Sequence, residues 1–416
     1  MKLLKVLVFM TAVTPALSTP GFAQDNRIDT VGTDAPSLAA FGPHAIGVRT
    51  LELLNPQQVD VTNSVEGEVT NYYDRRLTVE VWYPATLAAG QNPGTDYSTE
   101  TRNVDVLATL HGRAVRDAAP DSSGGAYPLV ILSHGYPGNR YLMSHLGENL
   151  ASKGYVVASI DHTESTYRRQ DPIASTLYNR PLDQRFVLEQ MAEMGADGSS
   201  FLTGLVDADN TALIGFSMGG YGLVNNFGGA VNPDMISNAI SPPNEVLEDH
   251  SSRNRRYRRN LDARFKAGVA IAPWGMNSGY FTSQTVAGVD RPVLFVAGSV
   301  DGTAGYVEGT RAIFENAKGA DRYLLTFEGG GHSVAAPIPV PMEVLNAPEQ
   351  RGAGHYTDGH WDSIRANNIL QHFVTAFLDL NLKGEQSKGE YLNDSWKGFA
   401  PGSAAELQLE HLGKGQ

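Results

Sequence analysis

The stretch TALIGFSMGG, residues 211–220, decides the fold of this chain. Its first six residues form an apolar run that is typical of a buried strand, and a helix-like segment follows. Ser217 therefore lies at a tight turn from strand to helix, where only glycine fits on either side. The Gly-x-Ser-x-Gly pattern is common by itself. In this position it predicts a serine hydroxyl held at the carboxyl end of a parallel sheet.

Apolar runs and amphipathic segments alternate on both sides of this turn. The predicted strands are 45–54, 77–83, 127–133, 155–160, 211–216, 268–272, 292–297 and 323–327. The predicted helices are 141–153, 182–194, 306–317 and 361–380. This alternation predicts an α/β fold with a mostly parallel sheet of about eight strands and helices on both faces. The first two strands would form an antiparallel edge.

The same pattern divides the chain. Residues 1–23 have a basic start, a short apolar run and small residues before Gln24, so we expect a secretory signal peptide and a periplasmic or secreted protein. A flexible leader, 24–40, precedes one domain over 41–400, and 401–416 is expected to be a C-terminal tail. Two stretches do not fit the alternation. Residues 88–126 suggest a surface excursion, and 225–262 suggest a lid-like insertion.

Composition excludes several classes of protein. The 416 residues have a formal net charge of −13, which argues against nucleic acid or an anionic membrane surface as the main partner. The chain has no cysteine, so disulfides, cysteine metal sites and cysteine nucleophiles are excluded together. After the signal no apolar run is long enough for an integral membrane segment.

A serine hydroxyl becomes a nucleophile only with a base, and the base needs an acid to orient it. In a sheet of this kind the chain order is serine, then aspartate or glutamate, then histidine. Asp301 follows the strand 292–297, and His332 follows the strand 323–327 in a glycine-rich loop. Since the carboxyl ends of parallel strands share one edge, we expect Ser217, Asp301 and His332 to meet there.

Other side chains compete for these roles. Glu328 is the fallback for the acid, whereas Asp290 and Asp321 precede their strands and so lie at the wrong end. Among the histidines, His134 is expected to fix a neighbouring loop by hydrogen bonding. Three others lie in polar stretches and are expected to be solvated: His111, His250 and His411. The HYTDGH segment, 355–360, has no metal-ligand spacing, so no metal site is predicted.

An acyl-transfer site also needs two N–H donors for the oxygen of the tetrahedral intermediate. One should be the backbone N–H of Met218, the residue after the serine. The other should come from the loop HGYPG, 134–138, after the strand 127–133. Pro137 has no N–H, so Tyr136 is the better donor, and its ring would line the cleft.

The segment SHGYPGNRYLMSHLGENLASKGYVVASIDH, 133–162, resembles platelet-activating-factor acetylhydrolases and dienelactone-hydrolase-like α/β hydrolases. Three further segments resemble cutinase-like polyester hydrolases: AGVAIAPWGMNSG (267–279), RPVLFVAGSVDGTAG (291–305) and LLTFEGGGHSVA (324–335). The resemblance covers about 44–335 in patches. It implies an α/β-hydrolase fold, a Ser–Asp–His triad and ester hydrolysis. It also implies that Tyr136 and Met218 form the oxyanion hole and that Trp274 lies on the cleft wall as a substrate contact.

The chain departs from both groups. Dienelactone hydrolases proper use a cysteine nucleophile, and the cutinase-like enzymes lack an insertion like 225–262. Within that insertion, five arginines fall in residues 253–259. They are expected to be a solvated surface that pairs with Glu245, Glu248 and Asp249, the alternative being a clamp for carboxylate or phosphate.

The sequence therefore predicts a serine hydrolase of carboxylic esters that needs no cofactor. Its substrate would be a small-molecule or polymeric ester, such as a short acyl ester, a phospholipid-like ester or a polyester. Two alternatives remain open at this point. One is an amidase or peptidase of the same fold, and the other is a non-catalytic binding protein on a hydrolase scaffold.

Overall fold

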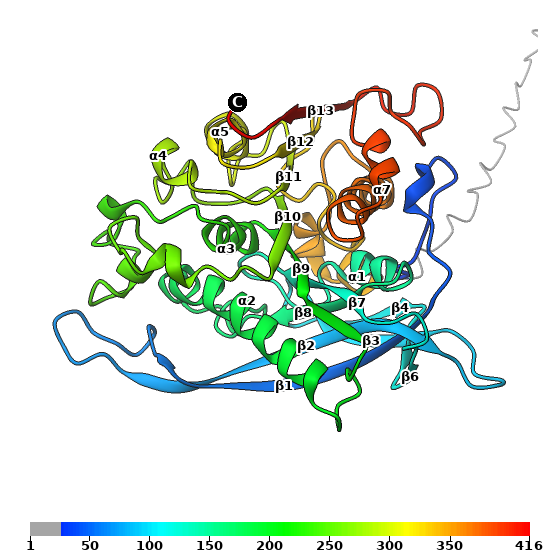
Figure 1. The fold of residues 1–416 in the computed structure, drawn as a ribbon, viewed down its shortest axis with the longest axis horizontal. Coiled ribbons are helices and arrows are strands. Elements are labelled where there is room, and N and C mark those ends of the chain that lie inside the picture. The colour runs from blue at the N-terminus through cyan, green and yellow to red at the C-terminus, as the bar shows by residue number, and fades with distance from the viewer. Residues whose placement is uncertain (1–25) are drawn as a thin grey trace, which may run out of the picture.

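A computed structural model describes residues 26–416, so the predicted signal peptide, 1–23, lies outside the described residues. Its main sheet has eleven strands in the order β13-β12-β11-β10-β9-β7-β8-β2-β1-β5, with β6 paired to β2 (Figure 1). The strands of this sheet are β1 Ala45–Val59, β2 Tyr72–Thr86, β5 Val115–Arg116, β6 Ala119–Pro120, β7 Tyr127–Ser133, β8 Val156–Asp161, β9 Val206–Phe216, β10 Phe265–Ile271, β11 Val293–Gly298, β12 Arg322–Phe327 and β13 Leu407–Leu412.

The six central strands, β7 to β12, are parallel, whereas β1, β2 and β13 run antiparallel to their main neighbours. The parallel strands are continuous apolar runs because helices cover both of their faces. Every one of the eight predicted strands is present, so the predicted fold class is confirmed, although the sheet has eleven strands rather than about eight. All parallel strands end at one edge of the sheet, which brings the loops after β7, β9, β11 and β12 together.

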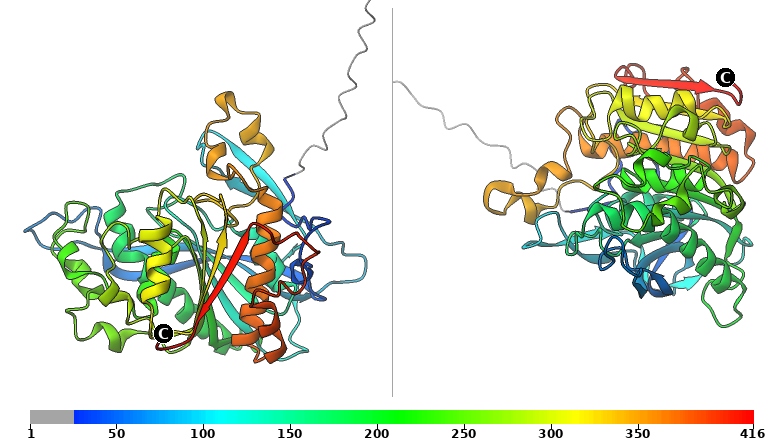
Figure 2. Two further views of the ribbon diagram at one scale, coloured as in Figure 1. Left: turned by 90° about the horizontal axis from the view of Figure 1, so that it is seen from above. Right: turned by 90° about the vertical axis from the view of Figure 1, so that its left-hand side faces the viewer.

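Two layers of helices enclose the sheet (Figures 1 and 2). On one face α1 (Ser144–Ala151) and α7 (Ser363–Asn381) share an apolar core with the sheet, and on the other face α2 and α3 pack in a second core. The remaining α-helices are α2 Ile173–Ala196, α3 Met218–Asn226, α4 Ser283–Val286, α5 Ala312–Asn316 and α6 Met342–Leu345. A π-helical turn, Tyr306–Arg311, precedes α5.

Helix α2 begins at Ile173, nine residues before its predicted start at 182, and Pro181 lies inside it. A proline in a helix removes one N–H donor and leaves the carbonyl four residues earlier without a partner. That carbonyl, Leu177 O, accepts a hydrogen bond from the Tyr221 hydroxyl of α3 at 3.1 Å. The next carbonyl, Tyr178 O, accepts from His250 Nε2 at 2.8 Å. His250 is 1% exposed, so its prediction as a solvated residue is wrong.

The segment 88–126 is not the loose surface excursion that was expected. It contains a two-stranded antiparallel sheet, β3 Thr95–Glu100 with β4 Leu107–Gly112, as well as β5 and β6. Tyr97 of β3 is buried and donates to Glu148 of α1 at 2.5 Å, while Trp82 Nε1 donates to its hydroxyl at 2.9 Å. The hairpin also packs beside the segment around residue 350, since Arg102 N donates to the Tyr356 hydroxyl at 2.9 Å (Figure 2).

Both predicted ends of the domain are wrong. Within the expected flexible leader, Ile28 and Ala39 are buried in the core, and Ile28 N donates to His111 O at 3.0 Å. At the other end, the expected tail supplies β13, which pairs antiparallel with β12 along its whole length. Leu407 of β13 is buried in the same apolar core as α7. Polar composition hid both segments because each contributes only a few apolar side chains.

The insertion 225–262 forms three 3₁₀ turns, Pro233–Met235, Val246–His250 and Tyr257–Asn260. It is fastened to the body at both ends, since Tyr257 donates to Asn225 O of α3 and Asn232 N donates to Tyr280 O at 2.8 Å. Its tip binds the β1–β2 hairpin, where Asn244 N donates to Glu66 at 2.7 Å. The insertion thus supports the loop that carries Trp274.

The five arginines of 253–259 are exposed, as a solvated surface requires. The predicted pairing is wrong, however: Arg253 pairs with Asp234 at 3.6 Å, and not with Glu245, Glu248 or Asp249.

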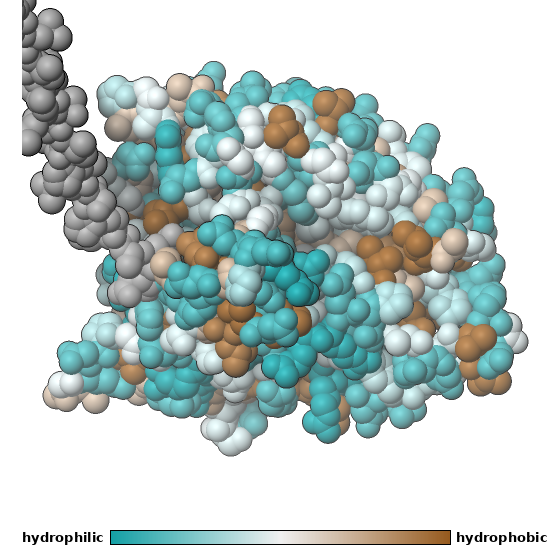
Figure 3. Space-filling model, turned by 180° about the vertical axis from the view of Figure 1, so that it is seen from behind, coloured by the Kyte–Doolittle hydropathy of each residue, from teal (hydrophilic) through white to brown (hydrophobic). Residues whose placement is uncertain are grey.

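On the face in Figure 3, hydrophobic residues are scattered among hydrophilic ones, a distribution that needs no partner to explain it. Over residues 26–416, no helix combines the length and the apolar character needed to cross a membrane.

The buried histidines should make the free energy of unfolding depend on pH. Burial lowers the pKa of His145 to about 4 and that of His250 to about 3. Below pH ~6.5 the unfolded chain binds protons at these histidines while the folded protein does not, so stability falls as the pH falls. Each histidine is expected to remove about 1.4 kcal/mol per pH unit between pH ~6 and its folded pKa.

Urea denaturation at several pH values between 7.5 and 4.5 measures this slope. His250→Gln keeps a donor for Tyr178 O but cannot be protonated, and it should flatten the slope by about 1.4 kcal/mol per pH unit. An unchanged slope in this variant would contradict the prediction.

Candidate active site

Ser217 lies at the sharp turn between β9 and α3. Its backbone has φ 53° and ψ −112°, a left-handed conformation that is strained for a residue other than glycine. Glycines flank it because an added Cβ on Gly219 would collide with Ser133 O, and one on Gly215 would collide with the backbone of Gly219. The turn lifts the hydroxyl above the carboxyl edge of the sheet, although the residue is only 7% exposed.

The structure brings the three predicted residues together. His332 Nε2 lies 3.1 Å from Ser217 Oγ, and His332 Nδ1 lies 2.9 Å from Asp301 Oδ2. The histidine ring also packs against the ring of Phe216, with centroids 5.1 Å apart. One nitrogen thus faces the serine and the other faces the carboxylate, which is the geometry of a serine–base–acid series.

Asp301 is held ionised. Its side chain is fully buried, and burial alone would raise the pKa of the carboxyl. Hydrogen bonds from His332 and from the backbone N–H groups of Thr303 and Ala304 instead lower the pKa below its ordinary value. The two backbone donors occupy Oδ1, so Oδ2 is left for the imidazole.

The rival acids lie elsewhere. Asp290 pairs with Arg291, and Asp321 pairs with His411 on β13. Glu328 remains beside the histidine loop, but the ring of His332 is bonded to Asp301. Among the other histidines weighed from the sequence, His111 is partly exposed and pairs with Asp96.

A segment that sequence reasoning missed supports the loop of His332. Asp358 Oδ2 accepts from Gly331 N at 2.7 Å, directly before the histidine. Trp361 Nε1 donates to Glu328 O at 2.8 Å, and the Trp361 ring stacks edge-on against Phe327. The HYTDGH motif therefore acts as a structural support here. Within residues 26–416 no group of three or more His, Asp or Glu side chains is placed to hold a metal.

The loop after β7 lies against the serine. A Cβ added to Gly135 would lie 3.3 Å from Ser217 Cβ, so the next peptide, which carries the Tyr136 N–H, is at the serine. Met218 is the first residue of α3, and N–H groups of a first helical turn have no partner within the helix. Both segments predicted to supply oxyanion donors thus border Ser217.

The two predicted substrate contacts, Trp274 and Tyr136, are both partly exposed. Trp274 is partly exposed, and its backbone N–H donates to Ser217 O at 3.2 Å. Its ring packs on Tyr280, with centroids 5.4 Å apart. Tyr280 and Phe281 are buried and belong to the core beneath it. The ring of Tyr136 is partly buried, and its hydroxyl donates to Asp171 O.

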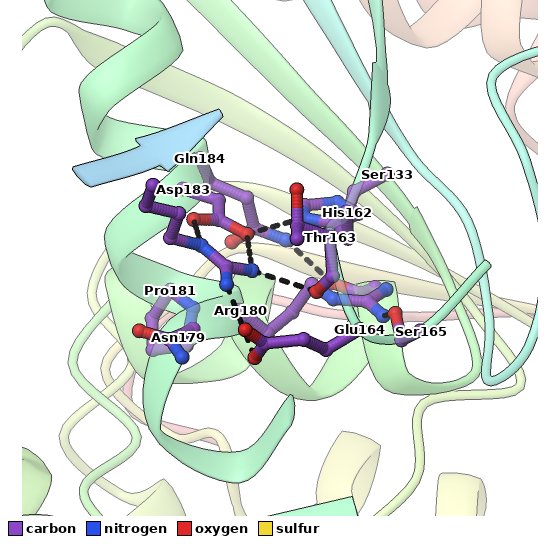
Figure 4. A network of polar contacts seen from close by, with 12 residues as sticks. Ser133, His162, Thr163, Glu164, Ser165, Asn179, Arg180, Pro181, Asp183 and Gln184 are labelled. Carbon is purple, nitrogen blue, oxygen red and sulfur yellow. Dashed lines mark hydrogen bonds and ion pairs between the residues drawn. The ribbon is translucent and has the colours of Figure 1, made fainter. Parts of the chain in front are cut away.

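A second Ser–His–Asp series, formed by Ser133, His162 and Asp183, lies buried in the core (Figure 4). Ser133 Oγ is 2.8 Å from His162 Nε2, and His162 Nδ1 is 2.9 Å from Asp183 Oδ2. All three side chains are at most 1% exposed, and Arg75 binds the carboxylate of Asp183 through two nitrogens at 2.7 and 2.9 Å. No sequence motif marks this series, because its members come from β7, the end of β8 and α2.

His134 is bonded within the loop, as the sequence predicted. Its Nδ1 is 2.8 Å from Gly135 O, and its Nε2 accepts from His162 N at 3.2 Å. Burial lowers the pKa of His134 well below its ordinary value, so the ring is neutral, with the proton on Nδ1.

The chain is similar to a known family and to several known proteins. The family model described as PET hydrolase-like matches residues 85–244. The chain is 27% identical over 191 residues to the platelet-activating factor acetylhydrolase of Bos taurus, and the match covers 42% of this chain and 40% of that protein. It is 25% identical over 253 residues to a cutinase of Thermobifida alba, covering 58% of this chain and 67% of the cutinase. The chain therefore spans less than half of the acetylhydrolase.

Among solved structures, a ferulic acid esterase from Streptomyces cinnamoneus is similar, with a TM-score of 0.61 and 22% sequence identity. The match covers 90% of this chain and 99% of the esterase, so nearly the whole fold is shared. The chain therefore has the α/β-hydrolase fold. The proteins that it is similar to are named as an acetylhydrolase, a cutinase and a ferulic acid esterase, and the resemblance inferred from sequence is confirmed.

Proposed function

We propose that this protein is a serine hydrolase of carboxylic esters. The observation that carries the proposal is the bonded series from Ser217 Oγ through His332 to Asp301, with distances of 3.1 and 2.9 Å, at a serine of positive φ. The names of its relatives, acetylhydrolase, cutinase and ferulic acid esterase, support ester bonds as the target.

The reaction proceeds through an acyl-enzyme. His332 Nε2 takes the proton of Ser217 as the serine oxygen attacks the ester carbonyl carbon. Asp301 stabilises the imidazolium that forms, and the N–H groups of Met218 and Tyr136 bind the oxyanion. His332 then protonates the leaving alcohol. In the second half, His332 activates water, which releases the acid and restores Ser217.

Labelling with a fluorophosphonate probe tests the nucleophile directly. We expect stoichiometric labelling of the native protein, with the added mass on the peptide that contains Ser217. A binding protein without catalytic function would stay unlabelled, and this result would overturn the proposal.

Matched substrates distinguish esterase from amidase. The p-nitrophenyl ester and the p-nitroanilide of the same short acyl group share one carbonyl and differ in the leaving group. We expect turnover of the ester only, over a series of acyl lengths that identifies the preferred substrate. Comparable turnover of the anilide would favour the amidase alternative.

The proposal includes secretion or a periplasmic location. It rests on the pattern of residues 1–23, where a basic start precedes an apolar run and small residues. N-terminal sequencing of the exported protein should then begin near residue 24.

A further inference from the structure

Helix α2 carries a buried arginine that has no carboxylate partner. Arg180 is 1% exposed, and within residues 26–416 no ion pair includes it. Its guanidinium donates to three neutral oxygens: His134 O, Gly135 O at 3.2 Å and Ser165 Oγ at 2.5 Å. Figure 4 labels Arg180 and Ser165. A buried cation with no carboxylate within ion-pair distance is costly for folding, so its presence calls for a functional reason.

The two carbonyls that Arg180 binds belong to the loop beside Ser217. The carbonyl of Gly135 and the N–H of Tyr136 share one planar trans peptide, in which they point in opposite directions. Because Arg180, together with His134 Nδ1, holds the carbonyl toward the interior, the Tyr136 N–H faces outward. Gly135 itself borders Ser217, so outward from this peptide is the space above the serine.

The same face of α2 also binds the first turn of α3, which carries Met218, the other predicted donor to the oxyanion. Gln184, one helical turn after Arg180, donates to Ser133 Oγ at 2.9 Å and to Gly219 O in the first turn of α3 at 3.0 Å. Gly222 of α3 makes room for both side chains, since an added Cβ would lie 2.9 Å from Arg180 Cγ and 2.7 Å from Gln184. One face of α2 therefore fixes both segments that supply donors to the oxyanion.

We propose that Arg180 is a positioning residue for the oxyanion hole: by fixing the carbonyls of His134 and Gly135, it aims the Tyr136 N–H at the oxygen of the tetrahedral intermediate. This inference rests on the proposed ester hydrolysis. The buried charge also favours the developing oxyanion in a site of low dielectric. Burial lowers the pKa of Arg180 only to about 9, so the group stays charged at neutral pH.

Kinetics of matched oxoester and thionoester substrates test the proposal. An oxyanion hole is fitted to oxygen, and it binds the larger sulfur of a thionoester poorly. Arg180→Lys keeps the charge but cannot bind two carbonyls with one planar fork. We expect kcat for the oxoester to fall about 10²-fold with KM nearly unchanged, and the ratio of oxoester to thionoester rates to fall with it.

Arg322→Lys is the matched control. Arg322 is equally buried and also donates to backbone carbonyls, but it lies at the opposite end of β12 from the site. Its replacement should lower thermal stability without changing the ratio of the two rates. Should Arg180→Lys fail to fold, Ser165→Ala removes one acceptor of the guanidinium and should shift the ratio in the same direction, by about threefold.

The outcomes separate the two proposals. If the native protein turns over neither substrate and is not labelled at Ser217, the proposed function fails. If the native protein is active and both the Arg180 and Ser165 variants keep the native ratio, the positioning role is overturned. If Arg322→Lys lowered the ratio of oxoester to thionoester rates as well, the change in Arg180→Lys would reflect general destabilisation. That result would also overturn the positioning role.

Discussion

Ser217→Ala is expected to lower kcat for a short p-nitrophenyl ester on the order of 10⁶-fold. The alanine side chain leaves no oxygen to attack the carbonyl carbon, so the acyl-enzyme cannot form, and only binding and the oxyanion donors remain. Folding should be intact, because Ser217 N still donates to Ile271 O and alanine fits the space of the serine. Steady-state kinetics and thermal melting measure the two effects.

The buried second series provides the matched control. Ser133, His162 and Asp183 have nearly the same internal distances as the series of Ser217, 2.8 and 2.9 Å. Ser133 is inaccessible, however, at 0% exposure, and its hydroxyl already accepts from Gln184. Ser133→Ala should therefore remain labelled by a fluorophosphonate, whereas Ser217→Ala should not. If Ser133→Ala lost the label while Ser217→Ala kept it, Ser133 and not Ser217 would be the nucleophile, and the proposed site would be wrong.

This pair of series shows what sequence could predict about the site. Ser217, Asp301 and His332 each follow a strand of the parallel sheet, so chain order alone brings them to one edge. Ser133 likewise ends β7, and His162 directly follows β8. Their burial comes from α2, whose start the sequence did not reveal. Exposure, which separates the two series, depends on packing between distant segments.

The fold was predictable where apolar runs were long. Pro181 hid the first half of α2, because proline usually ends a helix, while Tyr221 from α3 satisfies the carbonyl that it frees and His250 binds the next carbonyl. Strand β13 was missed because a polar strand at the edge of a sheet resembles a loop. Asp358 carried no motif of its own, since its partner Gly331 is recognised only once β12 and α7 are packed.

Asp183→Ala is expected to lower the free energy of unfolding by about 3–5 kcal/mol. Burial alone would lower the pKa of Arg75, yet Asp183 raises it above its ordinary value, so the guanidinium is charged in the core. Removing the carboxylate leaves that charge with Glu164 alone, at 3.2 Å, and leaves His162 Nδ1 without its acceptor. Urea denaturation measures the loss as a lower midpoint at an unchanged slope.

The comparison variant is Glu390→Ala. Glu390 pairs with Lys397 on the surface, where both side chains are exposed, and such pairs contribute at most about 1 kcal/mol. Replacing both buried partners, as Arg75→Met with Asp183→Leu, should restore part of the stability because the guanidinium charge is removed together with its carboxylate, while Glu164 keeps Arg169, 3.8 Å away. If the double variant is as unstable as Asp183→Ala, the loss comes from His162 rather than from Arg75. If Asp183→Ala loses no more than Glu390→Ala, the buried pair does not stabilise the fold.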